Sequence, residues 1–382
     1  MPIGSDKGNF IKPGFLPLTV GPEGPTVAQA WAWGLNDLGS LGLGDTSLRS
    51  SPVQIGTEAH WASLSASSPT TSGSAGVRTD GSLWTWGGNS HGGLGVGNTT
   101  NYSSPIQVGA LTDWLQVAAG YKYMSGIKTD GTLWSWGKNY QGCLGLGDTV
   151  DRSSPVQVGA LTTWAKVVTS YWFTLATTTD GKLYAWGYQG YGQLGQGNVT
   201  NYSSPVQVGA LTTWADVTAG RDFSLAIKTN GTLWAWGSNS AGQLGDAQAS
   251  RSSPVQVGAL TNWAAVVGGR VYSKAVKTDG TLWCWGEGGN GQLGQNSTTD
   301  YASPIQVGAL TTWFQVGGTE AATLAIKTDG TLWGWGHNNQ GQLGDGSLGQ
   351  RNSPIQVGGL TTWYKVSDNC NMTVSVFGTI VQ

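Results

Sequence analysis

The side chains that could perform acid–base, nucleophilic or metal chemistry are few and scattered. The sequence has three histidines and three cysteines, which are His60, His91, His337, Cys143, Cys284 and Cys370. The histidines share no metal-binding or catalytic spacing, and the odd number of widely spaced cysteines does not describe a disulfide framework. No G-x-S-x-G elbow, phosphate-binding loop or H-E-x-x-H motif occurs. These observations predict a protein that is not an enzyme and that holds no metal or cofactor.

Residues suited to recognising a partner are concentrated in one kind of segment. A W-x-x-V step recurs along the chain, and the short stretch after it reads YKY from Tyr121, YWF from Tyr171, RDF from Arg221, RVY from Arg270 and EAA from Glu320. Trp, Tyr and Arg dominate interaction hot spots. The predicted partner-binding residues are Tyr121, Lys122, Tyr171, Trp172, Arg221, Asp222, Arg270 and Glu320. Of these, Tyr121, Trp172, Arg221 and Arg270 are expected to be exposed, whereas Tyr123, Phe173, Phe223 and Tyr272 can equally be half-buried under the loops.

Three markers repeat about every fifty residues and indicate what must position those segments. Each occurs seven times: the W-x-W-G element, an S-P-x-Q-x-G segment and a Trp that opens the W-x-x-V step. The second Trp of W-x-W-G falls at Trp33, Trp86, Trp136, Trp186, Trp236, Trp285 and Trp335. A fixed period of this length indicates a solenoid, a propeller or an array.

Within one unit the apolar residues alternate with a period of two, which indicates strands. In Phe223 to Trp236 two alternating runs flank Asn230-Gly231, and an Asp-Gly or Asn-Gly pair recurs at this place. Such a pair predicts a hairpin with a type I′ turn, in which both central residues have positive φ. The W-x-x-V step gives a third strand, and the proline-containing segment gives a fourth at an edge. The sequence therefore predicts an all-β, seven-bladed β-propeller with four-stranded antiparallel blades.

The two ends of the chain are predicted to share one blade. Asn371–Phe377 aligns without gaps with the strand that precedes the Asn-Gly turn in other units, and the chain then stops. Thr26–Gly34 matches the strand that should follow it. Strands from both termini would therefore close the ring, over a propeller domain of residues 26–382 preceded by an N-terminal arm of residues 1–25.

The markers resemble those of the regulator of chromosome condensation repeat family. The resemblance lies in Gly231–Gly237 (GTLWAWG), Asn239–Gly245 (NSAGQLG) and Pro254–Gly258, and its copies cover about residues 26 to 377. It implies a seven-bladed propeller and says little about function, because members include an exchange factor, a photoreceptor and an enzyme inhibitor. In this family the short stretch after the W-x-x-V step often carries a histidine, and in the photoreceptor a Gly-Trp-Arg-His-Thr run. Both are missing from that stretch here.

Tryptophan and the loops before each S-P give two structural expectations. Twenty of the 21 Trp residues stand at repeat positions, which indicates packing between blades rather than a binding platform. Four loops carry an Asp and an Arg that we expect to pair, with the weakest pairing in the last two: Asp45/Arg49, Asp148/Arg152, Asp246/Arg251 and Asp345/Arg351. The alternate loops carry Asn and Tyr instead: Asn98/Tyr102, Asn198/Tyr202 and Asn296/Tyr301.

Composition excludes several classes of partner. The net charge is −2 and no Lys/Arg run occurs, so no nucleic-acid partner is expected. No stretch is long and apolar enough for a signal peptide or a membrane span, which predicts a soluble, cytoplasmic or virion-borne protein without membrane insertion.

The leading functional prediction is a non-enzymatic scaffold that presents loops on a rigid disc to protein partners. Low charge and an arm that could hold other chains of an assembly suggest a phage or viral tail or virion surface component that acts in assembly or host attachment. The alternatives are a regulator or inhibitor that binds an enzyme through the aromatic loops, and a propeller that binds glycans.

Overall fold

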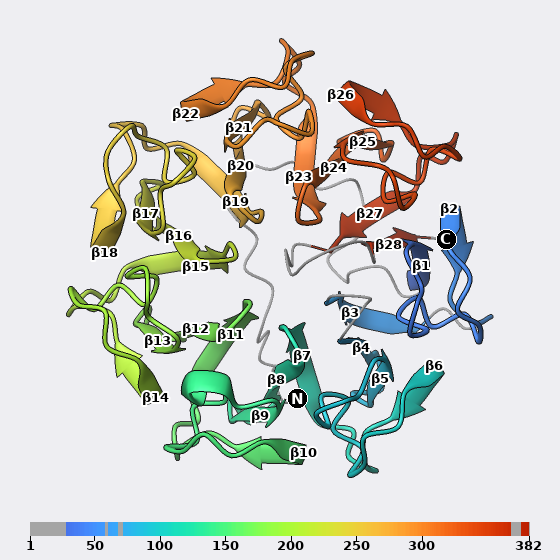
Figure 1. Cartoon of the computed structure of the whole chain (residues 1–382), viewed down its shortest axis with the longest axis vertical. Helices are drawn as coiled ribbons and strands as arrows, with labels where there is room; N and C mark the ends of the chain where they lie inside the picture. Colours follow the sequence, from blue (N-terminus) through green and yellow to red (C-terminus); the bar gives the residue numbers. More distant parts are fainter. Residues whose placement is uncertain (1–27, 58–59, 68–71, 368–375, 382) are drawn as a thin grey trace, which may run out of the picture.

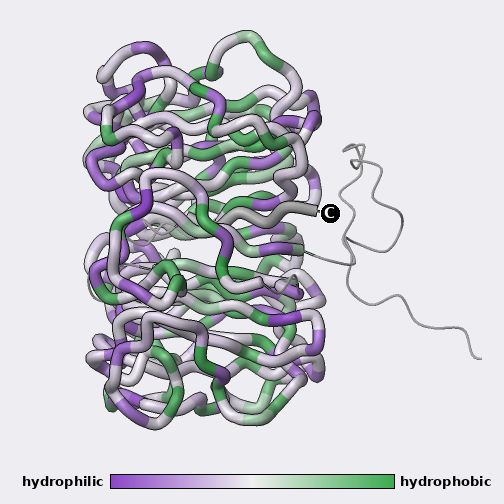
Figure 2. The backbone as a smooth tube through the Cα atoms, turned by 90° about the vertical axis from the view of Figure 1, so that its right-hand side faces the viewer, coloured by the Kyte–Doolittle hydropathy of each residue, from purple (hydrophilic) through white to green (hydrophobic). Residues whose placement is uncertain are grey.

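The computed structural model describes residues 28–57, 60–67, 72–367 and 376–381. These residues form a ring of four-stranded antiparallel sheets around a central axis (Figure 1). Seen edge-on, the ring is a flattened disc (Figure 2). Within the described residues the only helical element is the short 3-10 turn η1 (Tyr140–Gly142). The predicted all-β propeller with four-stranded antiparallel blades is confirmed.

Each sheet uses its strands in the same order from the axis to the rim. The innermost strands are β3 (Trp61–Ser65), β7 (Trp114–Ala119), β11 (Trp164–Thr169), β15 (Trp214–Ala219), β19 (Trp263–Gly268), β23 (Trp313–Gly318) and β27 (Trp363–Val366). The second strands are β4 (Gly73–Arg78), β8 (Tyr123–Lys128), β12 (Phe173–Thr178), β16 (Phe223–Lys228), β20 (Tyr272–Lys277), β24 (Ala322–Lys327) and β28 (Val376–Val381). The third strands are β5 (Leu83–Gly87), β9 (Leu133–Gly137), β13 (Leu183–Gly187), β17 (Leu233–Gly237), β21 (Leu282–Gly286), β25 (Leu332–Gly336) and β1 (Ala28–Gly34). The outermost strands are β6 (Tyr102–Gln107), β10 (Arg152–Gln157), β14 (Tyr202–Gln207), β18 (Arg251–Gln256), β22 (Tyr301–Gln306), β26 (Arg351–Gln356) and β2 (Arg49–Gln54).

Six blades use consecutive strands, and a further sheet in the order β2-β1-β28-β27 joins the two ends of the described chain. Its strand β28 lies at Val376–Val381 rather than at the predicted Asn371–Phe377, so the ungapped alignment is wrong by several residues there. Residues 371–375 of the expected strand lie outside the described residues. In the other blades a short hairpin sets the register of the second and third strands. No hairpin joins β28 to β1, so the repeat spacing does not set their register.

The hairpins form where predicted, but the turn type differs from the prediction. In the β16–β17 hairpin Gly231 has φ of 76°, whereas Asn230 is not among the residues with positive φ. The Gly231 N–H donates to the Lys228 carbonyl at 2.8 Å, which closes a three-residue loop ending in a left-handed glycine. The Asn230 side chain accepts hydrogen bonds from the Thr232 N–H and hydroxyl, at 3.2 and 2.8 Å. These side-chain hydrogen bonds stabilise the turn, so Asn230 does not need a positive φ.

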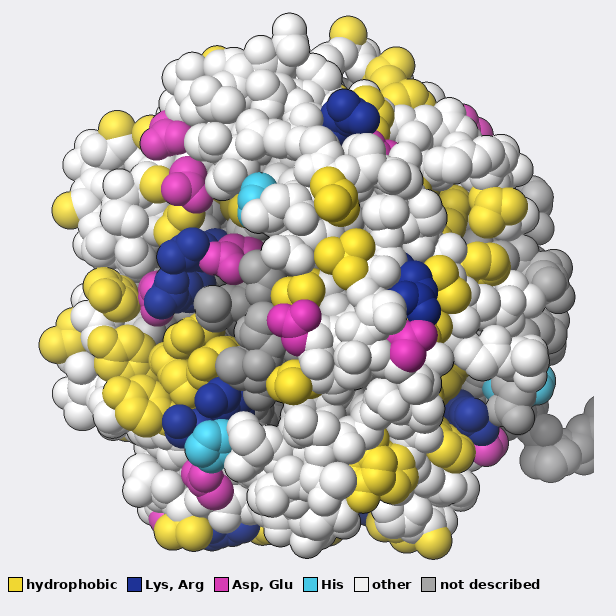
Figure 3. Space-filling model, turned by 45° about the vertical axis from the view of Figure 1, so that its right-hand side comes forward, with side chains coloured by type: hydrophobic (Ala, Val, Ile, Leu, Met, Phe, Trp, Pro, Cys, Tyr) yellow, Lys and Arg dark blue, Asp and Glu magenta, His cyan; other side chains and the backbone are white. Residues whose placement is uncertain are grey.

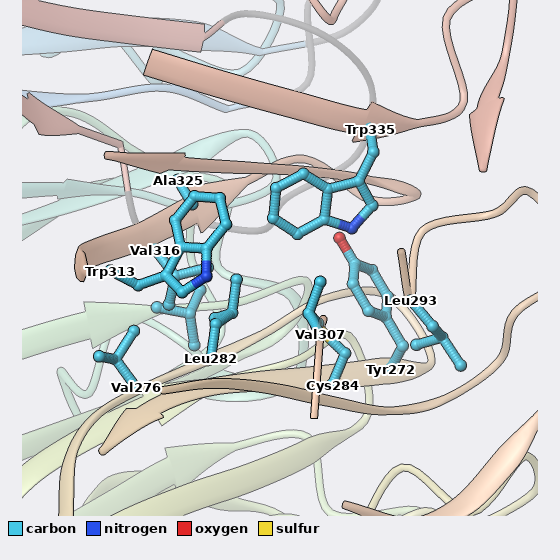
Figure 4. Close-up of a cluster of buried hydrophobic side chains, with 11 residues drawn as sticks. Tyr272, Val276, Leu282, Cys284, Leu293, Val307, Trp313, Val316, Ala325 and Trp335 are labelled. Carbon is cyan, nitrogen blue, oxygen red and sulfur yellow. The ribbon is translucent and has the colours of Figure 1, made fainter. Parts of the chain in front are cut away.

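Indole rings fill the space between neighbouring blades, as predicted. The second Trp of every W-x-W-G element is fully buried, and so is the Trp that opens each innermost strand. Figure 4 shows one such layer, where Tyr272 and Leu282 of one blade meet Trp313 and Trp335 of the next. Each buried aromatic ring removes about 150–250 Å² from water. At about 25 cal/mol per Å² this is worth about 4–6 kcal/mol before the entropic cost.

The first Trp of the pair differs from this prediction because it is only half-buried. In five blades a Lys or Arg at the end of the second strand lies over its ring, as Lys228 Nζ does at 3.4 Å from the Trp234 centroid. The cation covers the outer face of the indole, and the ring edge packs against the buried Trp214 at 6.1 Å between centroids. The first Trp of each pair therefore lies at the boundary between the buried core and solvent.

The predicted Asp–Arg pairs form in all four loops. The closest nitrogen–oxygen distances are 2.5 Å for Asp45–Arg49, 2.6 Å for Asp148–Arg152, 2.6 Å for Asp246–Arg251 and 3.1 Å for Asp345–Arg351. The expectation of weaker pairing in the third of these loops is wrong, because one extra residue still lets the Arg side chain reach. In two alternate loops the Asn amide donates to the Tyr hydroxyl instead, at 3.1 Å for Asn98–Tyr102 and 3.0 Å for Asn198–Tyr202.

Strand direction divides the loops between two faces of the disc. Because neighbouring strands are antiparallel, the loops from first to second and from third to fourth strand lie on one face, which we call the loop face. The hairpin turns from second to third strand and the linkers between blades lie on the opposite face, which we call the turn face. The predicted arm of residues 1–25 lies outside the described residues.

Candidate interaction surface

All eight predicted partner-binding residues lie on the loop face, in the connections between innermost and second strands. Tyr121 and Lys122 join β7 to β8, Tyr171 and Trp172 join β11 to β12, and Arg221 and Asp222 join β15 to β16. Arg270 precedes β20 and Glu320 precedes β24. Each connection is tight, as in the bond of 2.8 Å from the Gly120 N–H to the Tyr123 carbonyl. The backbone that carries these side chains is therefore held in a fixed conformation.

Four rings from two neighbouring blades form a compact cluster that we call the aromatic platform: Tyr121, Tyr140, Tyr171 and Trp172. Tyr121 and Tyr171 stack with centroids 4.3 Å apart and planes at 20°. Trp172 meets both edge-on, at 4.7 and 4.9 Å. Tyr140 lies 4.6 Å from Trp172. Offset-stacked and edge-to-face geometries are the favourable arrangements of aromatic pairs, so the rings support one another while one side of the cluster remains partly exposed.

Tyr140 belongs to the platform but was missing from the sequence prediction. It lies in η1, in the loop from the third to the fourth strand, and is 42% exposed. The next blade adds Tyr188 and Tyr191 in the equivalent loop, with centroids 6.4 Å apart. The signal was available, because the other units place Asp, Ser, Gly or Asn where Tyr140 stands. The prediction considered departures from the repeat in only one of the two loop types on this face.

Three cations lie around the platform. Lys122 Nζ is 5.2 Å from the Tyr121 centroid, Lys138 Nζ is 5.2 Å from that of Trp172, and the Arg221 guanidinium carbon is 4.9 Å from that of Tyr171. All lie within the range of cation–π attraction. On the loop face, hydrophobic side chains gather in one patch with Lys and Arg on both sides (Figure 3). The patch is therefore apolar at its centre and basic at its edge.

Burial changes the acidity of two groups beside the platform. Desolvation, together with the neighbouring Tyr121 hydroxyl, raises the pKa of Tyr171 to about 12. Desolvation also raises the pKa of Asp222 above its usual value, although Arg221 and Arg270 act in the opposite direction.

Arg270 and Glu320 pair with each other and have no contact with the four rings of the platform among the ring contacts of the described residues. The Arg270 Nη1–Glu320 Oε1 distance is 2.7 Å, and the Glu320 side chain is largely buried, at 10% exposed. Arg270 is exposed, and Tyr121, Trp172 and Arg221 are half-exposed. The predicted residues thus divide into an aromatic, basic group and a neutralised ion pair on the neighbouring blades.

The four rings whose burial the sequence left open are fully buried: Tyr123, Phe173, Phe223 and Tyr272. The Tyr123 hydroxyl donates to the Phe173 carbonyl at 2.6 Å, and that of Tyr272 donates to the Ala322 carbonyl at 2.9 Å. Each bond joins one blade to the next directly beneath the loops. These rings therefore form the base of the surface and are not available to a partner.

The described residues offer little for catalysis. Among them, no three His, Cys, Asp or Glu side chains are placed to hold a metal ion. Cys143 and Cys284 are buried free thiols, and burial raises the pKa of Cys284 to about 12 and that of Cys143 still further. A thiol with a raised pKa is a poor nucleophile at neutral pH.

The fold and this surface define a class of protein: a tandem-repeat β-propeller whose candidate binding residues lie on loops at one face. The model of the regulator of chromosome condensation (RCC1) repeat matches the chain seven times, at residues 28–71, 80–125, 130–177, 180–227, 230–276, 279–326 and 329–372. The chain belongs to this family, as its motifs indicated. A second RCC1 repeat model matches residues 164–193 and 214–243.

Solved structures of similar fold cover nearly the whole chain. Human WBSCR16 superposes with a TM-score of 0.80 at 18% identity, over 92% of this chain and 98% of its own. Prp20p from Saccharomyces cerevisiae gives 0.79 at 16%, over 93% of this chain and 92% of its own. Yeast RCC1 (Prp20) in its complex with Kap60 gives 0.79 at 17%, over 93% and 89%. At these identities the likeness establishes the fold alone.

In the part of the chain that the structure describes, no helix has the length and apolar character needed to cross a bilayer.

Proposed function

We propose that this protein is a non-enzymatic interaction scaffold that binds a protein partner on the aromatic platform of its loop face. The observation that carries the proposal is the packing of Tyr121, Tyr140, Tyr171 and Trp172 into one self-supporting, partly exposed cluster. Rigid aromatic anchors lose little conformational entropy when they are covered, and they are the residues that dominate hot spots.

The relatives of similar fold support a binding role in general terms. The study of Prp20p describes its binding properties to Gsp1p and histones, and the same yeast protein was solved in complex with Kap60. Each of these is a protein partner of a yeast protein with this fold. The partner of the present chain is not implied by theirs, because function on a shared fold depends on the residues of the surface.

Three narrower roles have no separate observation in their favour: a phage or virion component, an enzyme inhibitor and a glycan-binding protein. A phage or virion role depended on composition and on the arm of residues 1–25, and the comparisons give it no support. Inhibition of an enzyme would use the same platform, and no observation singles out an enzyme as the partner. A glycan partner likewise has no separate observation in its favour.

The test places a photo-crosslinking side chain either at Tyr140 on the platform or at Leu211 on the turn face. Both are exposed, at 42% and 46%, so the two positions are matched in access. In extract of the native source we expect a discrete protein adduct from position 140 that disappears in a Trp172→Ala background, and none from position 211. Equal adducts from both positions, or adducts that survive Trp172→Ala, would disprove the proposal.

A further inference from the structure

Given the proposed function, the charges around the platform identify the chemistry of the partner. We propose that the platform binds an acidic segment of a protein, in which Asp or Glu side chains stand next to an aromatic or aliphatic residue. The apolar residue would cover the rings, and the carboxylates would meet the cations at their edge.

Two of the three cations form no ion pair with an acid in the part of the chain that the structure describes. Among the described residues neither Lys122 nor Lys138 forms an ion pair, and each amine instead lies over a platform ring, at 5.2 Å from the centroids of Tyr121 and Trp172. Both side chains are half-buried, which places the amines close to the surface that a partner would cover. An arriving carboxylate would therefore meet ammonium groups already held in position.

The third cation is only weakly compensated. The Arg221 Nε–Asp222 Oδ2 distance is 3.5 Å, longer than a good charge-assisted hydrogen bond. The other carboxylate of this region, Asp151, is already bound by the His91 ring at 3.1 Å and by the Asn139 N–H at 2.8 Å. Among the described residues, and apart from the Arg270–Glu320 pair, the platform thus has three cations against two acids, one weakly paired and one already bound. The net charge of the whole chain is −2.

Many cations elsewhere on the ring either pair closely with an acid or lie over half-buried indole rings at the turn face, as Lys228, Lys277 and Lys327 do. On the neighbouring blades Arg270 lies 2.7 Å from Glu320. On the innermost strands Lys166 lies 2.6 Å from Asp216. On the loop face, the positive charge of Lys122 and Lys138 therefore lies beside the partly exposed aromatic rings. This coincidence is what electrostatic complementarity to an acidic partner requires.

Single-stranded nucleic acid could also offer anions and flat rings, but the structure favours protein. Binding of a nucleic-acid backbone uses a continuous basic groove along several phosphates. Here the three cations surround one small patch, and the carboxylates of Asp151 and Asp222 lie beside it. An acidic segment of protein needs only a few carboxylates, placed on either side of one apolar side chain.

The experiment selects binders of the full-length protein from a displayed library of random 12-residue peptides. Clones are screened against the wild type and against the Trp172→Ala and Tyr140→Ala variants, after thermal melts confirm that each variant is folded. We expect platform-dependent clones to carry Asp or Glu within two residues of an aromatic or aliphatic residue. A Lys122→Gln/Lys138→Gln double variant should weaken these clones about tenfold and flatten the salt dependence of their affinity. The control Lys182→Gln, which removes an exposed pair with Asp180 on the turn face, should change neither.

The remaining outcomes separate the two proposals. Platform-dependent clones that are neutral or basic would overturn the acidic partner and leave the platform as a binding surface. Clones that bind Trp172→Ala and Tyr140→Ala as well as the wild type would overturn the proposed function, and the acidic partner with it. Displacement of acidic clones by a twelve-residue oligothymidylate at low micromolar concentration would favour nucleic acid and overturn the inference.

Discussion

The two faces of the disc show how one repeated frame can be uniform on one side and specialised on the other. On the turn face six of the linkers between blades share a G-x-L-T pattern, and each of the six exposes its Leu to a similar extent, between 43% and 53%. These residues are Leu111, Leu161, Leu211, Leu260, Leu310 and Leu360. On the loop face the equivalent connections differ from blade to blade, from Tyr121 and Lys122 to Glu320.

The difference follows from what each set of connections must touch. On the turn face a hairpin glycine packs against the linker, so that a Cβ on Gly231 would lie 2.1 Å from the Thr261 carbonyl oxygen. On the loop face the backbone is closed by its own hydrogen bonds and by buried rings such as Tyr123 and Phe223 beneath it. Side chains above that base are free to vary. Specificity can therefore change without disturbing the frame.

Removing a ring from the shared core should have the largest effect and should damage both faces together. Trp236 is fully buried between blades, and its indole N–H donates to the Gln193 carbonyl at 2.8 Å. We expect Trp236→Ala to lower the free energy of unfolding by about 3–5 kcal/mol. Denaturant unfolding gives the value, and Leu211→Ala on the exposed turn face serves as the control with a change below about 0.5 kcal/mol. A loss below 1 kcal/mol for Trp236→Ala would contradict the view that indoles hold the ring together.

Replacement of glycine should distinguish the two faces with a smaller effect. Gly231→Ala adds a Cβ at positive φ and against backbone, so we expect a loss of at least about 2 kcal/mol. Gly289, in a loop-face connection between β21 and β22, has no atom within 4 Å of an added Cβ. Gly289→Ala should stay within about 0.5 kcal/mol of the wild type. Thermal melts of both variants provide the comparison, and equal losses would show that the loop face is as constrained as the turn face.

Two carboxylates, one on each face, should give the stability a pH dependence of opposite sign, with the smallest effects. On the turn face, hydrogen bonds from Thr132 lower the pKa of Asp130 below 3.8. The native state then binds fewer protons than the unfolded state, so this contribution is present above the unfolded pKa and is lost as the pH falls. On the loop face, burial raises the pKa of Asp222. The native state then binds more protons, and a cost appears as the pH rises above the unfolded pKa towards the folded one.

Unfolding of Asp130→Ala and Asp222→Asn at pH 3 and pH 7 measures this difference. Asp130→Ala should destabilise the protein more at pH 7 than at pH 3. Asp222→Asn should stabilise it slightly at pH 7, and the gain should shrink at pH 3. If both variants shift stability in the same direction as the pH rises, the opposite contributions assigned to Asp130 and Asp222 are wrong.

Much of the frame could be predicted because its causes are local. Alternation around Asn230-Gly231 sets a hairpin, and Pro254 assigns its strand to the outer edge because proline cannot donate a ladder hydrogen bond. The Asp148–Arg152 pair also follows from spacing within one loop. The turn type was wrong because the Asn230 side chain supplies bonds that the dipeptide rule ignores.

The candidate surface was only partly predictable. The sequence located Tyr121 and Trp172 because they interrupt a regular pattern in a single loop type. It missed Tyr140, which departs from the repeat in the other loop type of this face and meets Trp172 across the blade boundary. It also grouped Arg270 and Glu320 with the aromatic residues. These two stand about fifty residues apart on successive blades, and the packing of the blades brings them together as an ion pair.

The sequence by itself determined the blades, since period-two alternation, turn residues and a fifty-residue repeat act within one unit and need no information from elsewhere. Only the tertiary structure decided how the ends meet and which side chains share a surface. The register of β28 on β1 has no connecting turn to set it, and the platform draws its rings from separate blades. Both depend on contacts between residues far apart in the chain, whose geometry is set by the closure of the ring and by the packing of its blades.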